Sequence, residues 1–221
     1  MVKKVRVWDL PTRLFHWALA VCFVGLIITS QVGGEAMVWH FRLGYSVLSL
    51  LLFRLVWGVV GGRWSRFASF MYTPSTLIRY LKGEHRAEHA VGHNPLGALS
   101  VWALLGFVLL QVAAGLFSDD EIATSGPLSK MASGEWVGRA TDYHTEVGIV
   151  ILIALVVLHI VAILFYRIKK KEDLISPMLN GDKELPDTVE PSRDDAVSRT
   201  LAAAVFLLCA GAVTWLVRWA N

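Results

Sequence analysis

Five long apolar runs interrupt an otherwise polar chain. They cover approximately residues 14–32, 41–61, 96–117, 145–166 and 199–218. An α-helix needs about 20 mainly apolar residues to cross the hydrocarbon core of a bilayer, and each run reaches about that length. None of the runs alternates apolar and polar residues as a membrane barrel strand does. Because a helix satisfies its own backbone hydrogen bonds in lipid, the pattern predicts an all-α fold, a transmembrane bundle of five helices.

The fifth run is separated from the first four by a polar connector, NGDKELPDTVEPSRDDAVS (residues 180–198). We therefore predict a four-helix domain over residues 1–185, followed over residues 186–221 by a linker and an additional C-terminal span. A cleavable secretory signal is the alternative for the first run, because ITSQVGGEA offers small residues for cleavage. That alternative would discard the RLFHW segment and leave an even number of spans.

Composition and charge give the same picture. Of 221 residues, 55% are hydrophobic and 18% charged, and the mean hydropathy is +0.52, far from the balance of a soluble domain. Lys and Arg gather in the N-terminal arm, between the second and third runs and between the fourth and fifth runs. These segments should be cytoplasmic, which places the N-terminus inside and the C-terminus outside. Loops facing anionic lipid explain the basic balance, and no separate domain suited to nucleic acid is evident.

Three of the seven histidines, His85, His89 and His93, lie four residues apart in the polar segment GEHRAEHAVGHNPLG. On a helix they would share one face and form a candidate metal site. Gly92 interrupts such a helix, however, and no acidic or thiol ligand completes a tetrahedral set. Cys22 and Cys209 lie within apolar runs and are interpreted as small apolar fillers, and the chain has no CxxCH motif.

The other four histidines belong to the membrane. His16 lies near the cytoplasmic end of the first run, His40 opens the second run outside, and His144 opens the fourth run outside. His159 follows His144 by 15 residues, which in a helix is about 22 Å of travel and about 60° of rotation. The fourth span thus offers an imidazole at each of two depths. Topology alone predicts an inner pair, His16 with His159, and an outer pair, His40 with His144.

A polar ring in lipid is costly unless it is paired, so intramembrane histidines are functional candidates. A single one is also compatible with a hydrogen-bonded core histidine, but four histidines in two level pairs are harder to explain in that way. Two imidazoles without thiolate or carboxylate do not complete a zinc site, whereas they do fill both axial positions of a haem iron. We therefore predict two non-covalent haem b groups, with one pair as the iron ligands of each.

Neighbouring residues support this interpretation. Gly44 and Gly148 each follow an outer histidine by one helical turn, where a missing side chain admits a flat macrocycle, although small-residue helix packing is the alternative. Arg54 lies 14 residues beyond His40, about 21 Å deeper and about 40° from its direction, and is predicted to neutralise a propionate of the inner haem. Snorkelling to the interface is the alternative for Arg54. Arg13 is a weaker candidate for the same role.

Six segments carry a family resemblance: WDLPTRLFHW, HFRLGY, FRLVWG, GHNPLGALSVWALLGFVLLQVAAGLF, DDEIATSGPL and VLHIVAILFYRIKKKEDLISPMLNG. Together they resemble the prokaryotic di-haem cytochrome b561 family, which also includes the cytochrome b subunits of nickel-iron hydrogenases and of formate dehydrogenase. The resemblance extends to about Leu185 and leaves the fifth run outside the shared four-helix core. It implies a bacterial inner membrane, electron exchange with membrane quinone, and bis-histidine ligation by His16, His40, His144 and His159. In this family the two ligands of the fourth span are more often 14 residues apart than 15, which leaves the direction of His144 open.

An iron with both axial positions filled by protein is suited to one-electron transfer. The sequence therefore predicts an electron-transfer protein of the respiratory chain, without a catalytic residue of its own, that links the quinone pool to a periplasmic c-type cytochrome or redox enzyme. The alternatives are a membrane-anchor subunit of a hydrogenase or dehydrogenase, and a haem-free transporter that uses the histidines as a proton relay. His93 and Asn94 are candidates for the quinone site, although Asn94 and Pro95 also fit a simple helix start. The acidic segment from Asp119 to Thr124 is a candidate for contact with the protein partner.

Overall fold

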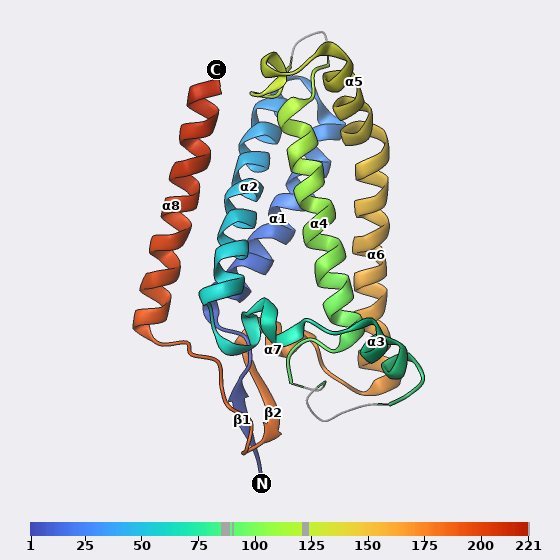
Figure 1. Ribbon diagram of the computed structural model, residues 1–221, viewed down its shortest axis with the longest axis vertical. Coiled ribbons are helices and arrows are strands. Elements are labelled where there is room, and N and C mark those ends of the chain that lie inside the picture. Colours follow the sequence, from blue (N-terminus) through green and yellow to red (C-terminus); the bar gives the residue numbers. More distant parts are fainter. Residues whose placement is uncertain (85–88, 90, 121–123, 221) are drawn as a thin grey trace. The chain divides into compact units, whose positions relative to one another are not determined.

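The protein is described by a computed structural model that covers residues 1–84, 89, 91–120 and 124–220. Five helices in it are long and apolar enough to cross a membrane. They are built around α1 (Leu10–Val32), α2 (Met37–Val60), α4 (Pro95–Phe117), α6 (Ile149–Phe165) and α8 (Ala196–Ala220) (Figure 1). The predicted all-α, five-span fold is therefore confirmed, and the chain is a multi-pass membrane protein.

The fourth span is longer than its apolar run predicts. It starts with α5 (Gly134–Asp142), passes through a π-helical turn, η6 (Tyr143–Gly148), and continues as α6 into a second π-helical turn, η7 (Tyr166–Lys170). The α5 segment is amphipathic rather than apolar throughout. Because polar residues interrupt it, a continuous apolar run does not predict it as part of the span.

Short elements connect the spans. They are α3 (Pro74–Leu81), α7 (Ile175–Asn180), the strands β1 (Val2–Arg6) and β2 (Asp182–Pro186), and the 3-10 turns η1 (Gly34–Ala36), η2 (Arg63–Ser65), η3 (Phe67–Phe70) and η5 (Ser129–Met131). The strands pair antiparallel, with Val2 opposite Pro186 and Arg6 opposite Asp182. They adjoin a small apolar core of Val5, Val7, Trp8, Val91 and Leu185. Residues 182–186 of the polar connector (180–198) therefore form a strand.

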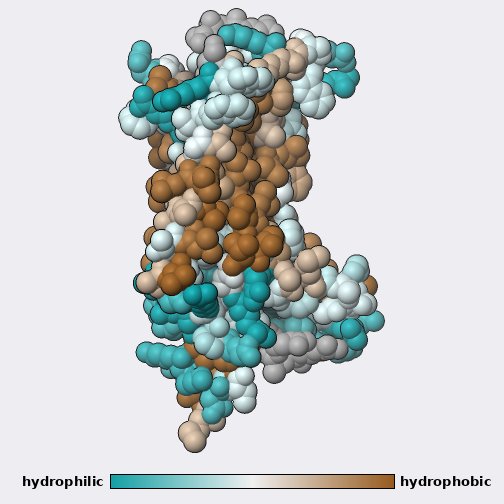
Figure 2. Space-filling model, turned by 60° about the vertical axis from the view of Figure 1, so that its left-hand side comes forward, coloured by the Kyte–Doolittle hydropathy of each residue, from teal (hydrophilic) through white to brown (hydrophobic). Residues whose placement is uncertain are grey.

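The chain divides into two compact units, and every long helix contributes to both. Unit 1 comprises Met1–His16, Arg54–Ala103 and Leu158–Val205. Unit 2 comprises Trp17–Phe53, Leu104–Val157 and Phe206–Asn221. The β1–β2 pair and its core lie in unit 1. On the face that Figure 2 shows, hydrophobic side chains cover the middle of the long helices and hydrophilic side chains gather toward their ends.

Carboxylates fix where two of the spans begin. Asp9 precedes α1 and accepts a hydrogen bond from the backbone N–H of Thr12 at 2.8 Å, so the helix begins at Leu10 rather than at the apolar run. Asp195 precedes α8 and accepts from the backbone N–H of Ser198 at 2.7 Å.

The neighbouring Asp194 joins α8 to the N-terminal arm. It accepts from Arg6 at 2.9 Å, from Arg199 at 2.9 Å and from the backbone N–H of Leu10 at 3.2 Å. Burial raises the pKa of Asp194, but the hydrogen bonds from Arg199 and Leu10 and the charges of Arg199 and Arg6 outweigh it, so the pKa lies below its ordinary value. The start of α8 is therefore tied to the start of the chain.

Candidate functional site

The first site brings together His16 from α1 and His159 from α6, both in unit 1. Their ring centroids lie 6.5 Å apart, and the ring planes are inclined by 51°. The second site brings together His40 from α2 and His144 from the π-helical turn η6, both in unit 2. Here the centroids lie 6.2 Å apart and the planes are inclined by 87°. The structure thus brings together the two predicted pairs.

These separations suit a single metal ion between two imidazoles. With each metal–nitrogen bond about 2.0 Å long and each ring centre about 1.2 Å further out, two imidazoles on opposite sides of an ion stand about 6.4 Å apart. Two imidazoles hydrogen-bonded to each other would lie closer, with their centres about 5 Å apart. Among the described residues, no group of three or more His, Cys, Asp or Glu side chains is placed to hold a metal ion, so the remaining ligands would have to come from a cofactor.

Hydrogen bonds at the second site engage Nδ1 of each histidine and leave Nε2 available to a metal ion. Nδ1 of His40 lies 3.2 Å from the carbonyl oxygen of Leu26, and Nδ1 of His144 lies 2.9 Å from the carbonyl oxygen of Gln111. A carbonyl oxygen only accepts, so each Nδ1 carries the proton and each Nε2 keeps its lone pair for a metal. Thr29 adds a contact of 3.2 Å from its hydroxyl to Nδ1 of His40.

The second site opens into a cavity of about 390 Å³ in unit 2. Both histidines line it, together with Gly44, and polar residues such as Asp119 and Thr141 lie at its wall. A Cβ added to Gly44 would meet no atom within 4 Å, so the missing side chain enlarges the cavity beside His40. This open face is the kind of surface that a flat macrocycle requires.

Three residues of the second site were missed or interpreted differently in the sequence. Gln111 donates from Nε2 to the carbonyl oxygen of His144 at 2.7 Å, so the two residues hold each other. A Cβ on Gly115 would lie 2.7 Å from Cε1 of His144. A Cβ on Gly148 would overlap Oε1 of Gln111 and approach the ring of Tyr143, and Gly148 is not among the residues that line the cavity. Gly148 therefore gives room to side chains of the protein.

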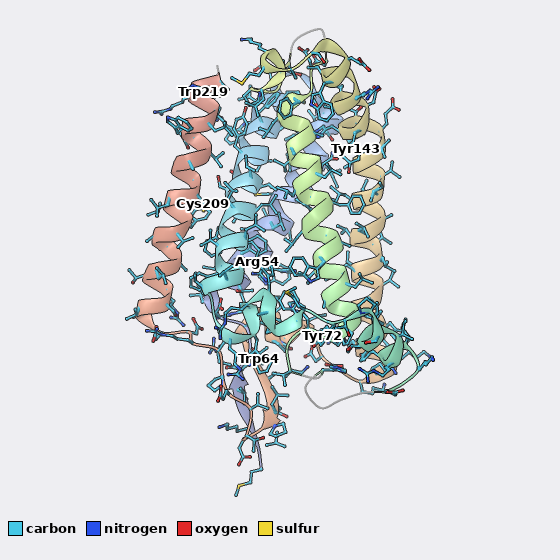
Figure 3. All side chains as sticks on the ribbon, in the orientation of Figure 1. Arg54, Trp64, Tyr72, Tyr143, Cys209 and Trp219 are labelled. Atoms are coloured by element: carbon cyan, nitrogen blue, oxygen red, sulfur yellow. The ribbon has the colours of Figure 1, made fainter. Side chains whose placement is uncertain are left out.

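The π-helical turn explains how His144 faces the cavity. Tyr143, labelled in Figure 3, begins this turn, and His144 follows it. A π turn holds one residue more than an α turn and is often found at functional sites. The additional residue of the π turn makes the 15-residue separation between His144 and His159 equivalent in direction to 14 residues of α-helix. His144 is thereby turned toward His40. The direction of His144, left open by the sequence, is thereby accounted for.

Arg54 is a buried cation of unit 1. It extends from α2 and is labelled in Figure 3; its side chain is 3% exposed, and its guanidinium lies 4.6 Å from the ring centre of Phe67. Nη1 is buried and has no hydrogen-bond partner among the described residues. A buried donor without an acceptor is costly, so this geometry is suited to an anionic group such as a propionate.

Arg13 has a different environment. One of its Nη atoms donates to the carbonyl oxygen of Leu179 at 2.5 Å, which directs the guanidinium toward α7. Its Nε is buried and without a hydrogen-bond partner in the part of the chain that the structure describes. Arg13 therefore has less free hydrogen-bonding capacity for a ligand than Arg54 has.

The two described histidines before α4, His89 and His93, pack against different aromatic side chains. The ring of His93 packs 4.6 Å from both Trp8 and Phe70, whereas His89 packs against Tyr72 and Tyr80. His85, the third member of the predicted face, lies outside the described residues. Burial of the ring, followed by the charge of Arg54, lowers the pKa of His93 to about 3, so His93 is neutral.

Asn94 caps α4. Its Oδ1 accepts from the backbone N–H of Gly97 at 2.7 Å, and Pro95 occupies the first helical position. The side chain of Asn94 is therefore engaged in starting the helix. Nδ1 of His93, in contrast, is buried and has no hydrogen-bond partner among the described residues.

Membrane spans that hold pairs of imidazoles at a metal-bridging separation are typical of b-type cytochromes. The chain belongs to the prokaryotic cytochrome b561 family, whose sequence model matches residues 7–181. The protein is therefore a membrane cytochrome of the b type, and its cofactor is haem b.

Curated relatives support this assignment. The chain is 26% identical over 208 residues to "Probable Ni/Fe-hydrogenase 1 B-type cytochrome subunit" of Escherichia coli K12, which covers 79% of this chain and 88% of the relative. It is 26% identical over 217 residues to "Probable Ni/Fe-hydrogenase B-type cytochrome subunit" of Azotobacter vinelandii, with 83% and 90% covered. A protein with the same name from Rhodobacter capsulatus is 23% identical over 221 residues, with 83% and 82% covered. No solved structure matches the chain.

Proposed function

We propose that this protein binds two haem b groups and passes electrons between membrane quinone and a redox protein outside a bacterial inner membrane. The observation that carries the proposal is the pair of histidine separations, 6.5 Å and 6.2 Å, each suited to one iron between two imidazoles. His16 and His159 would hold one iron, and His40 and His144 the other. Haem b supplies a one-electron couple when it is bound.

The surrounding residues would hold the cofactors and limit their chemistry. Two protein ligands on each iron leave no position for oxygen or substrate, which favours electron transfer over catalysis. Arg54 would neutralise a propionate at the first site, with Arg13 in a lesser role. Gly44 would face the macrocycle at the second site, and Gly148 would act indirectly by giving room to Gln111.

The distribution of Lys and Arg supports one orientation of the chain in the membrane. The segments rich in Lys and Arg would face the cytoplasm, so the first site would lie on the inner side and the second site on the outer side. The Asp119–Thr124 segment, of which residues 121–123 lie outside the described part of the chain, is then the candidate for contact with a periplasmic partner such as a c-type cytochrome. On the inner side, the buried Nδ1 of His93 would be available to a quinone carbonyl, whereas Asn94 is already engaged as a helix cap.

A membrane-anchor subunit of a hydrogenase is the second candidate, and the names of the curated relatives favour it. The same two sites would then receive electrons from a larger enzyme. Affinity purification of the full chain from its native membrane decides between the two: co-purification of a large iron-sulfur subunit supports the anchor role. Isolation of the haem-loaded chain alone, together with quinol oxidation by that preparation, supports the free-standing carrier.

Haem quantification tests the proposal itself. The wild-type chain should carry two haems, while His16→Ala and His40→Ala should each retain one, because each removes an iron ligand from one site only. His89→Ala is the matched control: it removes a buried histidine packed between tyrosines and should retain both haems. A wild-type ratio below two haems per chain, or retention of both haems in the ligand variants, contradicts the proposal.

A further inference from the structure

Asp9 is a wholly buried carboxylate that accepts four hydrogen bonds from neutral donors. Oδ1 accepts from the backbone N–H of Thr12 at 2.8 Å and from Nε1 of Trp57 at 3.1 Å. Oδ2 accepts from the backbone N–H of Gly62 at 3.1 Å and from the hydroxyl of Ser65 at 2.6 Å. Four donors without charge stabilise the ionised carboxylate but leave its negative charge in place.

This arrangement goes beyond a helix cap. Only the Thr12 bond belongs to α1, while the other three donors come from α2 and the segment that follows it. A Cβ on Gly62 would overlap Oδ2 of Asp9, so the close approach requires glycine at this position. Asp195, which caps α8 in the same way, is 51% exposed and bonds to its neighbours Arg193 and Ser198. Asp9 therefore ties the start of one span to the end of another.

The two tied segments carry the residues of the first site. His16 follows Asp9 on α1 by two helical turns, and Arg54 precedes Trp57 on α2 by one turn. Asp9 also interacts electrostatically with Arg54, although no hydrogen bond joins them. The carboxylate thus acts on the first site both through the backbone and through its charge.

We infer that Asp9 is a positioning residue for the first site, and that its buried charge lowers the reduction potential of the haem held there. This inference rests on the proposed function. A negative charge favours the ferric form, which carries one more positive charge than the ferrous form. The seven residues from Asp9 to His16 span about 10.5 Å along the helix. With about 12 Å between the carboxylate and the iron, and an effective dielectric constant of about 20, the charge changes the ferrous-to-ferric ratio about tenfold.

The test is a spectroelectrochemical titration of the purified, haem-loaded full chain carrying Asp9→Asn. Asparagine keeps the shape and can still cap a helix, but it has no charge and only one oxygen acceptor. We expect two haems per chain and a potential at the first site that is about 59 mV higher, which is a tenfold change for one electron. The haem at the second site should not shift. His16→Ala and His40→Ala assign the two potentials, since each leaves one haem.

Electron paramagnetic resonance reports the positional effect separately. The low-spin signal of the first haem depends on the angle between its two imidazole planes, 51° in the structure, and should shift in Asp9→Asn. Asp195→Asn is the matched control, because it alters a cap with local contacts only, and it should change neither potential nor signal. If Asp9→Asn leaves the first haem unchanged, lowers its potential, or shifts both haems equally, the inference is wrong.

A second variant keeps the inference testable if Asp9→Asn does not accumulate. Asp9→Glu retains the charge but displaces the donors, so the potential of the first haem should stay near the wild-type value while its resonance signal shifts. A potential that rises in Asp9→Glu overturns the inference. A wild-type protein without haem would refute the proposed function instead, so the two failures are distinguishable.

Discussion

Deletion of Glu146, an exposed residue of the π-helical turn η6, is expected to leave both haems bound. The π turn contains one residue more than an α turn, so the deletion would convert it into regular α-helix without turning the histidines away from their partners. Insertion of one alanine after Ala154, in the regular part of α6, is the contrasting variant. Both changes alter the fourth span by one residue, at exposed positions.

The geometry of the helix predicts opposite effects of the deletion and the insertion on haem binding. In an uninterrupted α-helix, the 15 residues from His144 to His159 end about 60° apart, and the extra residue in the π turn changes this to about 40° in the opposite sense. Deletion of Glu146 preserves that second angle. The insertion adds about 100° that no further turn absorbs. For a ring about 5–6 Å from the helix axis, 100° corresponds to a displacement of about 8–9 Å, which exceeds the 6.2 Å between the rings of the second site.

The assay is haem content per chain, with the redox titration identifying which haem is missing. The Glu146 deletion should contain two haems, and the alanine insertion should lose one. Loss of the second-site haem from the deletion variant would mean that the π turn does not set the direction of His144. Two haems in the insertion variant would refute the rotational argument altogether.

Three further substitutions test the sites and the fold. Arg54→Gln should lower the potential of the first haem, because a positive charge favours the ferrous form; at about 10 Å and an effective dielectric constant of about 20 the effect is about 1.7 kcal/mol, or about 70 mV, and a potentiometric titration showing no shift would contradict it. Gly115→Ala would put a Cβ 2.7 Å from His144 and should reduce haem at the second site, whereas Gly106→Ala on the same helix meets nothing within 4 Å and should retain both haems; equal pigment content in the two would speak against this. Asp194→Asn should lower the free energy of unfolding by about 1–3 kcal/mol at neutral pH. Because the folded state depresses the pKa of Asp194, its contribution is present above the ordinary pKa and is lost as pH falls through the folded value, so thermal melts of the two proteins should converge below about pH 4.

The spans and the pairing of the histidines were predictable because both depend on regular spacing. Apolar runs of fixed length define helices, and depth along a helix follows from residue number, so His16, His40, His144 and His159 could be placed in pairs without tertiary information. Arg54 was found in the same way, by counting turns from His40.

The supporting contacts were not predictable in this way. Gln111 and Gly115 are one helical turn apart in an apolar run, and nothing in that run says which helix they face. Three of the four hydrogen-bond donors to Asp9 lie about 50 positions away in the sequence. The short strands depend on a pairing between the N-terminal arm and the connector before the last span, and the π turn depends on packing. These features are set by tertiary contacts. The pattern of residues along one segment carries little information about such contacts.

The pairing of β1 with β2 has a consequence for biosynthesis. The first strand is made before any of the spans, yet its partner, Asp182–Pro186, follows only after four of the five spans. Until then Trp8 and the small apolar core around it cannot close over the neighbouring His93. This part of unit 1 therefore takes its final form only after the first four spans have been made, so its packing is a late step of folding.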